Sequence, residues 1–321
     1  MQITCQPTPL YRVIIGICAY DEEDNIAHLL QNLLSEQHIG ERCKILVICS
    51  GCTDHTPEIV REFQEEDVRI ELLREDLRKG KSNALNRIFR IARDSAEILV
   101  LVNADALPEK GSIGELVSKL SDYNVGAVFA QPVPFEAPSG TCFGIVRVIW
   151  RLHHVISLIE TPKLSGELCA IRTAYLREIP ENAATDEPYI ERAIRMQNKR
   201  VLYLPDALVR IRCPTNIIDL IKQRKRIWIG HIQLKASTGY KVSTSSFKNM
   251  FRAVAVLRLR DILYLLPGGF LEAIAYLQAR VAVKKGAVPY IWEPIRSTKT
   301  SLCLPDKPVS EEESVEARTA G

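Results

Sequence analysis

The segment EILVLVNADALPEK places an acid directly after a run of apolar residues. Residues 98–102 are all apolar and predict a buried strand, and Asn103 and Asp105 follow at the point where that strand ends. Amide and carboxylate oxygens are ligands of hard divalent cations, and Mg²⁺ or Mn²⁺ held in this way often carries a diphosphate as well. A turn or a helix cap is the alternative for the same residues, because Asn and Asp are frequent in both.

Polar segments also follow the three preceding apolar runs. AYDEED and SGCTDHT come after the first and the second, and EDLRKGKSNALN comes after the third. The last segment combines Gly80 with Arg78, Lys79 and Lys81 ahead of a predicted helix, whose N-terminus favours anions. This loop fits the neutralisation of a phosphate, and a basic helix cap without a ligand is the alternative. Its spacing matches neither the GxxxxGK[ST] loop nor the GxGxxG fingerprint of dinucleotide-binding proteins.

These polar segments need strands that end side by side. Through the first half of the chain, apolar runs at residues 12–19, 44–50, 68–74, 97–102 and 125–131 alternate with helix-period segments at residues 24–34, 56–66, 81–93 and 111–121. Repeated strand–helix units of this length predict an α/β fold with a mostly parallel sheet covered by helices on both faces. Ligands of such sheets bind beyond the carboxyl ends of the strands, where the polar segments lie.

The second half of the chain is less regular. It predicts helices at 142–160, after TDEP and at 217–235, and strands at 166–172 and 199–205. We expect one domain over residues 1–240, with a half at about 10–135 that holds the polar segments and a second half at about 136–240. Residues 241–297 form a C-terminal helical segment, in which 248–285 is predicted to be amphipathic, and 298–321 has the composition of a disordered tail.

The composition is that of a folded and nearly balanced protein. The 321 residues carry a net charge of +3, with 46% hydrophobic and 25% charged residues, so nucleic acid is not an expected partner. The cysteines are odd in number and irregularly spaced, which suits buried thiols in a reducing compartment, and the N-terminus lacks the pattern of a secretory signal. We therefore expect a cytoplasmic protein. A redox pair of Cys49 and Cys52 is the alternative use of SGCTDHT.

Taken in order, these motifs resemble those of the inverting glycosyltransferases of family 2, over about residues 13–234. The resemblance implies the GT-A fold, in which a Rossmann-like half binds a nucleotide-sugar and an adjoining half binds the acceptor. AYDEED is similar to the family's turn after the first strand, and SGCTDHT is similar to its second nucleotide turn. RKGKSNALN resembles its basic loop, and NAD resembles its metal-binding DxD motif.

The resemblance implies a role for one or more residues of each motif. For the donor it implies Tyr20, Glu22, Ser50, Asp54, Lys79, Lys81, Asn83, Asn103, Gln223 and Arg226. Asn103 stands where the family has the first acid of its metal motif, so Asp105 is the expected ligand of Mg²⁺ or Mn²⁺. ATDEPYIERAI occupies the place of the family's base motif, in which Asp186 is the expected base and Glu187 is the alternative. A helix N-cap is the other use of Asp186.

On the acceptor side, SGELCAIR implies Gly166 and Glu167. QRKRIWIGH resembles the family's QxxRW helix, with Gln223 and Arg226 in place and Trp228 displaced by one residue. The implied mechanism is a single displacement with inversion. The metal and the basic loop stabilise the departing nucleoside diphosphate, and a carboxylate removes the proton of the acceptor hydroxyl. The acceptor is left open, with a glycan and a lipid-linked molecule as the candidates.

Two other functions share this kind of fold. A non-catalytic nucleotide-sugar-binding or scaffold protein is the alternative hypothesis, because Asn103 and the order Thr185-Asp186-Glu187 depart from the family's pattern. A sugar nucleotidyltransferase is disfavoured, because AYDEED is acidic where that class carries a basic, Gly-rich loop.

The segment DILYLLPGGFLEAIAYLQARVAV is the most apolar late part of the chain. Pro267-Gly268-Gly269 is predicted to break it, and its longest uncharged run, residues 262–271, is about half of the roughly 20 residues of a spanning helix, so we expect no transmembrane helix. The 248–285 segment either lies on the inner surface of an anionic membrane, as in a peripheral protein, or packs on the domain with its charges outward. Whether these helices also form a homodimer is left open.

Overall fold

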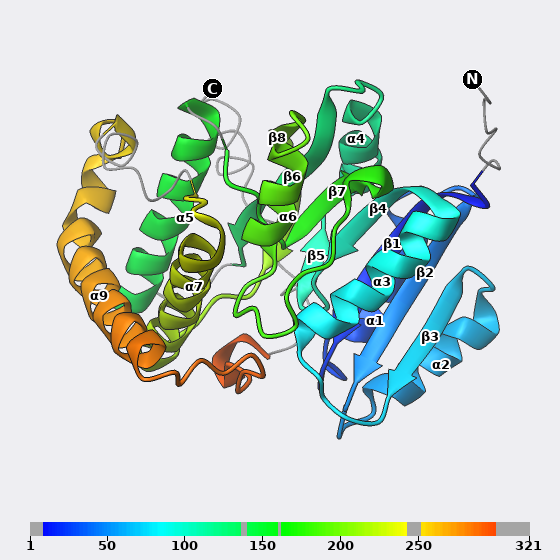
Figure 1. Ribbon diagram of the computed structural model, residues 1–321, viewed down its shortest axis with the longest axis horizontal. Coiled ribbons are helices and arrows are strands. Elements are labelled where there is room, and N and C mark those ends of the chain that lie inside the picture. Colours follow the sequence, from blue (N-terminus) through cyan, green and yellow to red (C-terminus); the bar gives the residue numbers. More distant parts are fainter. Residues whose placement is uncertain (1–8, 136–139, 160–161, 243–251, 300–321) are drawn as a thin grey trace.

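A computed structural model describes residues 9–135, 140–159, 162–242 and 252–299 of the chain (Figure 1). Its centre is an 8-stranded sheet with the strand order β3-β2-β1-β4-β7-β6-β8-β5. The strands are β1 (Tyr11–Ala19), β2 (Cys43–Ser50), β3 (Ile70–Glu75), β4 (Ala96–Val102), β5 (Ala106–Pro108), β6 (Val125–Pro134), β7 (Leu168–Arg172) and β8 (Arg200–Ile211). β1 to β4 run parallel, β6 pairs in parallel with β8, and β5 and β7 run antiparallel to their neighbours. The sheet is mostly parallel, as predicted.

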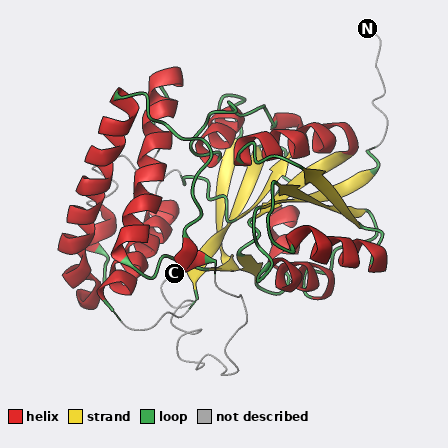
Figure 2. Cartoon of the chain, turned by 90° about the horizontal axis from the view of Figure 1, so that it is seen from below, coloured by secondary structure: helices red, strands yellow, loops and turns green. Residues whose placement is uncertain are grey.

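Helices cover both faces of the sheet (Figure 2). The helices are α1 (Ile26–Ser35), α2 (Thr56–Glu66), α3 (Lys81–Ser95), α4 (Ser112–Lys119), α5 (Thr141–Ile159), α6 (Glu187–Arg195), α7 (Ile217–Thr238) and α9 (Leu259–Lys284), with short 3-10 helices at Thr173–Tyr175 and Arg296–Thr298. α1, α2 and α4 bury apolar side chains against one face, and α3 and α6 bury theirs against the other. The buried residues of α1 are Ile26, Leu29, Leu30 and Leu33, which form one stripe at helical spacing. The predicted fold class is confirmed.

A second group of helices stands beside the sheet. α5, α7 and α9 lie together at the left of Figure 1, and α9 contacts both of the others. Ile145 of α5, Leu220 of α7 and Leu271 of α9 are buried in one apolar cluster. This layer borders the carboxyl edge of the sheet through α7.

α9 is continuous from Leu259 to Lys284 and contains Pro267. The prediction that Pro267-Gly268-Gly269 breaks this segment is therefore wrong. Proline removes one backbone hydrogen bond and glycine is a poor helix former, but burial of the inner face of α9 against α5 and α7 stabilises the helix. Among the described residues, one helical segment, Asp261–Lys284, is both long enough and apolar enough to cross a membrane. In its most apolar stretch, 22% of the residues are buried. The expectation of no transmembrane helix rested on the uncharged run 262–271, which is shorter than the continuous apolar helix that the structure shows.

The chain returns from α9 to the carboxyl edge of the sheet. Thr298 is buried, and Lys299 contacts Tyr20 and Glu22. The sequence assigned both Thr298 and Lys299 to a disordered tail. The rest of that tail, 300–321, lies outside the described residues, as does the 243–251 part of the predicted helical segment.

Candidate functional site

Residues that follow β1 and β4 face a common crevice at the carboxyl edge of the sheet. β1 has β2 on one side and β4 on the other, and the carboxyl ends of strands leave a crevice at such a switch in strand order. Tyr20 and Glu22 follow β1, and Asn103 and Asp105 follow β4. All four line one polar pocket, which we call the strand-end pocket.

Most of the residues predicted to bind the donor line the strand-end pocket. The predicted residues that line it are Tyr20, Glu22, Ser50, Lys81, Asn103, Asp105, Glu167, Gln223 and Arg226. Gln223 and Arg226 come from α7, where their spacing of three residues puts them on one face of the helix. Residues 290–295, 298 and 299 complete the wall of the pocket.

Three carboxylates converge on the strand-end pocket. Glu22 is 6% exposed, and burial together with the charge of Asp105 raises its pKa to about 7. Burial and Asp105 also raise the pKa of Glu167 to about 7. Carboxylates that repel one another in a partly buried site are neutralised by a bound Mg²⁺ or Mn²⁺, for which oxygen is the preferred ligand. Asp105 is thus near enough to Glu22 and Glu167 for its charge to affect both, although the possible ligand atoms of these three residues do not all lie within 4.8 Å of one another.

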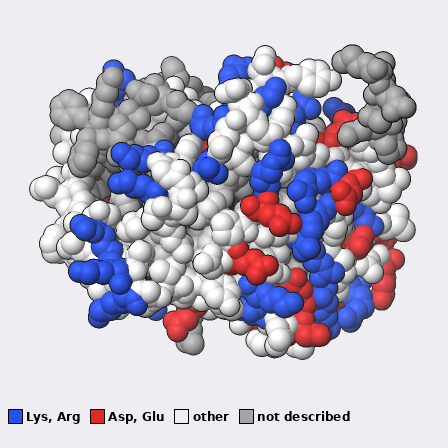
Figure 3. Space-filling view, viewed as in Figure 1, with Lys and Arg blue, Asp and Glu red and all other residues white. Residues whose placement is uncertain are grey.

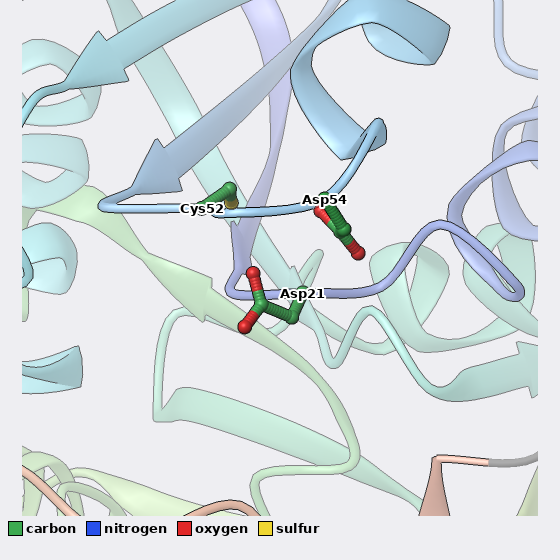
Figure 4. A group of neighbouring side chains, drawn as sticks. All are labelled: Asp21, Cys52 and Asp54. Carbon is green, nitrogen blue, oxygen red and sulfur yellow. The ribbon is translucent and has the colours of Figure 1, made fainter.

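Among the described residues, one group of candidate metal ligands has all of its possible ligand atoms within 4.8 Å of one another. It consists of Asp21, Cys52 and Asp54, in the turns that follow β1 and β2 (Figure 4). Asp21 accepts a hydrogen bond from the backbone N of Thr53 at 2.8 Å, and Asp54 accepts one from the backbone N of Glu23 at 3.0 Å. Each bond joins one turn to the other, so the two carboxylates hold the turns together. Asp54, predicted to bind the donor, lies in this group and lines neither the strand-end pocket nor the second pocket described below.

Lys81 connects the ends of β4 and α6. Its Nζ lies 3.1 Å from Oδ1 of Asn103 and 3.2 Å from Oδ2 of Asp186. Burial opposes the charge of Lys81, but the carboxylates of Asp186 and Glu187 raise its pKa. Asn103 also donates from Nδ2 to Glu167 at 2.7 Å. The amide at position 103 thus orients a cation and a carboxylate at once, which an aspartate could not do because it lacks a donor.

A second pocket, which we call the helix pocket, opens between α5, α7 and the loop before α6. Its apolar wall includes Val146, Ile149, Trp150, Leu220 and Ile227. Its polar wall includes Lys163, Gly166, Asp186, Glu187, Arg224 and His231. The two pockets share Lys81, Glu167, Gln223, Arg226, Tyr290 and Trp292 and therefore adjoin.

Two glycines allow close packing around Asp186 and Glu187. A Cβ on Gly166 would lie 2.6 Å from Oε1 of Glu187, and a Cβ on Gly230 of α7 would lie 2.0 Å from Oγ1 of Thr185. Gly166 thus makes room for Glu187, while Gly230 lets α7 contact the residue before Asp186. Asp186 precedes α6 but makes no side-chain capping bond to it. Burial and the neighbouring Asp186 raise the pKa of Glu187.

The basic loop brings one of its two lysines into the pockets. Lys81 lines both, whereas Lys79 and Asn83 line a separate surface groove. Gly80 lies between the two lysines with a φ of +89°, a conformation that favours glycine, and the chain turns there. In this structure Lys79 and Asn83 therefore lie outside both pockets.

Trp228 also lies outside both pockets. Its Nε1 donates to Oε2 of Glu272 at 2.7 Å, which joins α7 to α9. Trp228 lies five positions after Gln223, so its side chain leaves α7 on another face than Gln223 and Arg226. The displacement of Trp228 by one residue from the QxxRW pattern thus places its side chain outside the two pockets.

Sequence reasoning did not single out Lys163, Trp292 or Lys299. Lys163 lines the helix pocket, and burial lowers its pKa. Its place just before the predicted SGELCAIR segment was the available signal. Trp292 and Lys299 have no such signal, because they reach the strand-end pocket only through the return of the chain after α9.

The sequence model of glycosyl transferase family 2 matches residues 14–179. The match begins in β1 and includes every polar segment at the strand ends, together with Gly166 and Glu167. The chain belongs to glycosyl transferase family 2. The resemblance stated from the motifs is confirmed, and with it the assignment to a family of enzymes that transfer glycosyl groups.

Two relatives of known name are similar to this chain over only part of their length. Glycosyltransferase AglE of Haloferax volcanii is 31% identical over 132 residues, which are 41% of this chain and 42% of that protein. The beta-monoglucosyldiacylglycerol synthase of a Nostoc strain is 30% identical over 118 residues, which are 36% of this chain and 25% of that protein. The chain thus spans less than half the length of these relatives.

Among solved structures, the mannosyltransferase PcManGT from Pyrobaculum calidifontis, in complex with GDP-Man and Mn²⁺, is 26% identical to this chain. The two superpose with a TM-score of 0.59, over 91% of this chain and 84% of that one. This likeness confirms the GT-A fold and extends beyond the 14–179 region matched by the family model.

Proposed function

We propose that the protein transfers a sugar from a nucleotide-sugar to a hydroxyl group of an acceptor, in a single displacement that inverts the anomeric carbon. The junction of the two pockets carries this proposal. The strand-end pocket and the helix pocket share Lys81, Glu167 and Arg226, and Asp186 contacts Lys81 at that junction. Group transfer requires two bound substrates to meet at one point with a base beside the attacking hydroxyl, and two adjoining pockets with Asp186 at their junction support such an arrangement.

The strand-end pocket is the proposed donor site. Lys81 and Arg226 supply positive charge for the departing diphosphate, and Nε of Arg226 is buried without a hydrogen-bond partner among the described residues. Asp105, with Glu22 and Glu167 beside it, would hold Mg²⁺ or Mn²⁺, which when bound neutralises charge on a diphosphate. The family match and the position of the pocket at the strand ends support this assignment.

The helix pocket is the proposed acceptor site, with Asp186 as the base. Asp186 is 8% exposed and contacts Lys81 through Oδ2, which leaves Oδ1 to take the proton of an acceptor hydroxyl. Glu187 is the alternative base, because it lines the same pocket and its pKa is raised. The base must lie within about 3 Å of the hydroxyl in the complex. The close packing that the glycines at 166 and 230 permit would help to hold the base in that position.

The outward face of α9 supports a further part of this proposal, which is contact with an anionic membrane. Leu263, Leu266, Phe270, Leu277 and Val281 are 53–85% exposed and recur at helical spacing along one stripe. A stripe of this kind can lie in the headgroup boundary of a bilayer, where a lipid-linked acceptor would also be found.

The charges of α9 favour the same partner. Both of its carboxylates face inward: Asp261 contacts Arg147 and Arg151 of α5 at 3.2 and 3.3 Å, and Glu272 pairs with Arg224 of α7. Among the side chains of α9 and its C-cap that the structure describes, the exposed charged residues are the basic Arg280, Lys284 and Lys285. At the left of Figure 3, basic side chains lie on the part of the surface over α9, whereas basic and acidic side chains are mixed over the half that holds the sheet. This distribution complements anionic lipid.

The test of donor binding is thermal unfolding of the full chain with a panel of nucleoside diphosphates and nucleotide-sugars, in Mn²⁺, in Mg²⁺ and in EDTA. A ligand at 100 times its Kd adds about 2.7 kcal/mol to the free energy of unfolding, and we expect a shift of this size for one nucleotide in the presence of metal. Asp105→Ala should abolish the metal dependence. Asp94→Asn, which changes an exposed carboxylate of α3, is the matched control.

Two outcomes would change the proposal. If no nucleotide shifts the unfolding temperature, the assignment of the strand-end pocket to a donor is wrong. If a nucleotide-sugar binds but a screen of glycan and lipid-linked acceptors yields no transfer, the non-catalytic binding protein becomes the better hypothesis.

A further inference from the structure

The end of the described chain forms part of the strand-end pocket. After α9 the chain crosses from the helical layer to the carboxyl edge of the sheet, drawn in red at the lower centre of Figure 1. Residues 290–295, 298 and 299 line the pocket together with the loops after β1 and β4. We call residues 287–299 the C-terminal strap.

Specific contacts hold the strap in this place. Arg78 stacks over the ring of Tyr20, with its Cζ 3.7 Å from the ring centre, and donates from Nη2 to the backbone O of Trp292 at 2.6 Å. Gly80 leaves space for Tyr290, since a Cβ at position 80 would lie 3.3 Å from both the ring and the backbone O of Tyr290. The strap therefore packs on the same basic loop that supplies Lys81.

Lys299, at the end of the strap, brings a positive charge into the strand-end pocket. Its Nζ pairs with Oε1 of Glu22 and donates to the backbone O of Tyr20 at 3.0 Å. Lys299 lines the pocket, and its side chain is 25% exposed. Glu22 is also close enough to Asp105 for the charge of Asp105 to raise its pKa. The ammonium group is thus held beside the proposed metal-binding carboxylates.

We propose that Lys299 is a donor-binding residue that contacts the diphosphate of the nucleotide, and that the strap forms a wall of the donor site. This inference rests on the proposed function. An ammonium group has three donors and is a compact point charge, which suits phosphate oxygens. Two of the donors have protein partners in the described structure, and the third is left for a ligand. Contact with Glu22 fixes the ammonium group before the nucleotide arrives.

Calorimetric titration of the full chain tests this inference. The ligands are the nucleoside diphosphate that gives the largest thermal shift with the wild type, and the matching nucleoside without phosphates. We expect Lys299→Ala to weaken binding of the diphosphate roughly tenfold to a hundredfold and to change binding of the nucleoside less than threefold, because only the diphosphate loses a charged partner. Lys299→Arg should restore most of the affinity. Lys119→Ala, which removes an exposed lysine of α4, is the matched control.

Each other outcome would overturn the inference. Equal loss for diphosphate and nucleoside would mean that Lys299 only holds the strap in place. Unchanged affinity would remove Lys299 from the donor site, and tighter binding would show that it obstructs the site. Failure of the wild type to bind any nucleoside diphosphate would remove the proposed function as well. Wild-type binding with an unaffected Lys299→Ala variant would remove this inference alone.

Discussion

Asp186 and Glu187 are neighbours in the helix pocket, but their surroundings differ. Asp186 pairs with Lys81, which also contacts Asn103, so it is tied to the strand-end pocket. Glu187 packs against Gly166, and its pKa is raised. We expect Asp186→Asn to reduce transfer about a hundredfold or more, because the proton acceptor is lost. Donor affinity should change less, because the amide oxygen of Asn can still accept a hydrogen bond from Lys81. Initial rates with a saturating donor would measure this.

The matched variant is Glu187→Gln, which should retain most of the rate if Asp186 is the base. The pH profile separates the two carboxylates further. The pKa values of Glu187, Glu22 and Glu167 are all raised. A wild-type rate whose acid limb lies well above the ordinary value of 4.5 would therefore point to Glu187 only if this limb is lost in Glu187→Gln. A profile of that kind, together with a larger loss in Glu187→Gln than in Asp186→Asn, would reverse the assignment.

Glu167 allows a test of charge in the site without a substrate. Burial and Asp105 raise its pKa from 4.5 to about 7, so between these pH values the folded protein keeps a proton that the unfolded chain has lost. The contribution of Glu167 to the free energy of unfolding therefore falls as the pH rises through this range. Glu167→Gln should be more stable than the wild type by up to about 3 kcal/mol above pH 7 and by little below pH 4.5, since one pKa unit corresponds to about 1.4 kcal/mol.

Urea unfolding in the absence of divalent cations, at a series of pH values, would measure this difference. Glu97→Gln changes an exposed carboxylate of β4 and serves as the control for a surface substitution. If the free energies of unfolding of the wild type and of Glu167→Gln change in parallel with pH, the surroundings of Glu167 do not destabilise its charged form.

At the scale of elements, α7 positions the loop that carries the proposed base. Gly230 lies against Thr185, and a methyl group at position 230 would lie 2.0 Å from Oγ1 of Thr185. We expect Gly230→Ala to displace the loop and to lower the transfer rate tenfold or more, because small displacements of catalytic groups cost large factors in rate. Overpacking should also lower the free energy of unfolding by about 1–3 kcal/mol.

Gly114→Ala in α4 is the control, because a Cβ there meets nothing within 4 Å and alanine favours a helix. Thr185→Ala combined with Gly230→Ala should recover part of the rate, since it removes the two closest atoms, Oγ1 and Cγ2 of Thr185. A Gly230→Ala variant with wild-type rate and stability would show that α7 does not set the position of Asp186.

At the scale of the whole molecule, the exposed stripe of α9 predicts binding to anionic vesicles. Leu266 and Phe270 are 85% and 70% exposed near its centre. Wild-type protein should sediment with vesicles that contain phosphatidylglycerol and less with vesicles of phosphatidylcholine alone, because both apolar burial and basic residues contribute. Leu266→Glu with Phe270→Glu should weaken this binding at least tenfold. Val68→Glu, at a side chain 89% exposed beside the sheet, should not.

A different result would identify another partner for the same face. If the wild type stays in the supernatant and elutes as a dimer, and if Leu266→Glu with Phe270→Glu gives a monomer, the stripe is an interface between two copies of the chain. The membrane proposal would then be wrong.

The sequence by itself determined the sheet and the loops at its carboxyl edge. Strands are short apolar runs and amphipathic helices have a period of 3.6, so local patterns predicted β1 to β4 and the helices between them. Parallel strands end at the same edge, so this alternation also predicted that the segments with Glu22, Lys81 and Asp105 meet. β5, Ala106–Pro108, was not predicted, because three residues are too short to show a period.

Tertiary structure decided the parts that depend on contacts between distant segments. α9 remains a helix through Pro267 because α5 and α7 bury its inner face, and no local pattern contains that information. The spacing along α7 turns Trp228 away from Gln223 and Arg226, but its partner, Glu272 of α9, comes from the packing of the two helices. Lys299 enters the site because the chain folds back after α9 and meets Glu22, 277 residues earlier in the sequence. A single sequence records periodicity and residue type, whereas the partner of each side chain follows from how the elements pack.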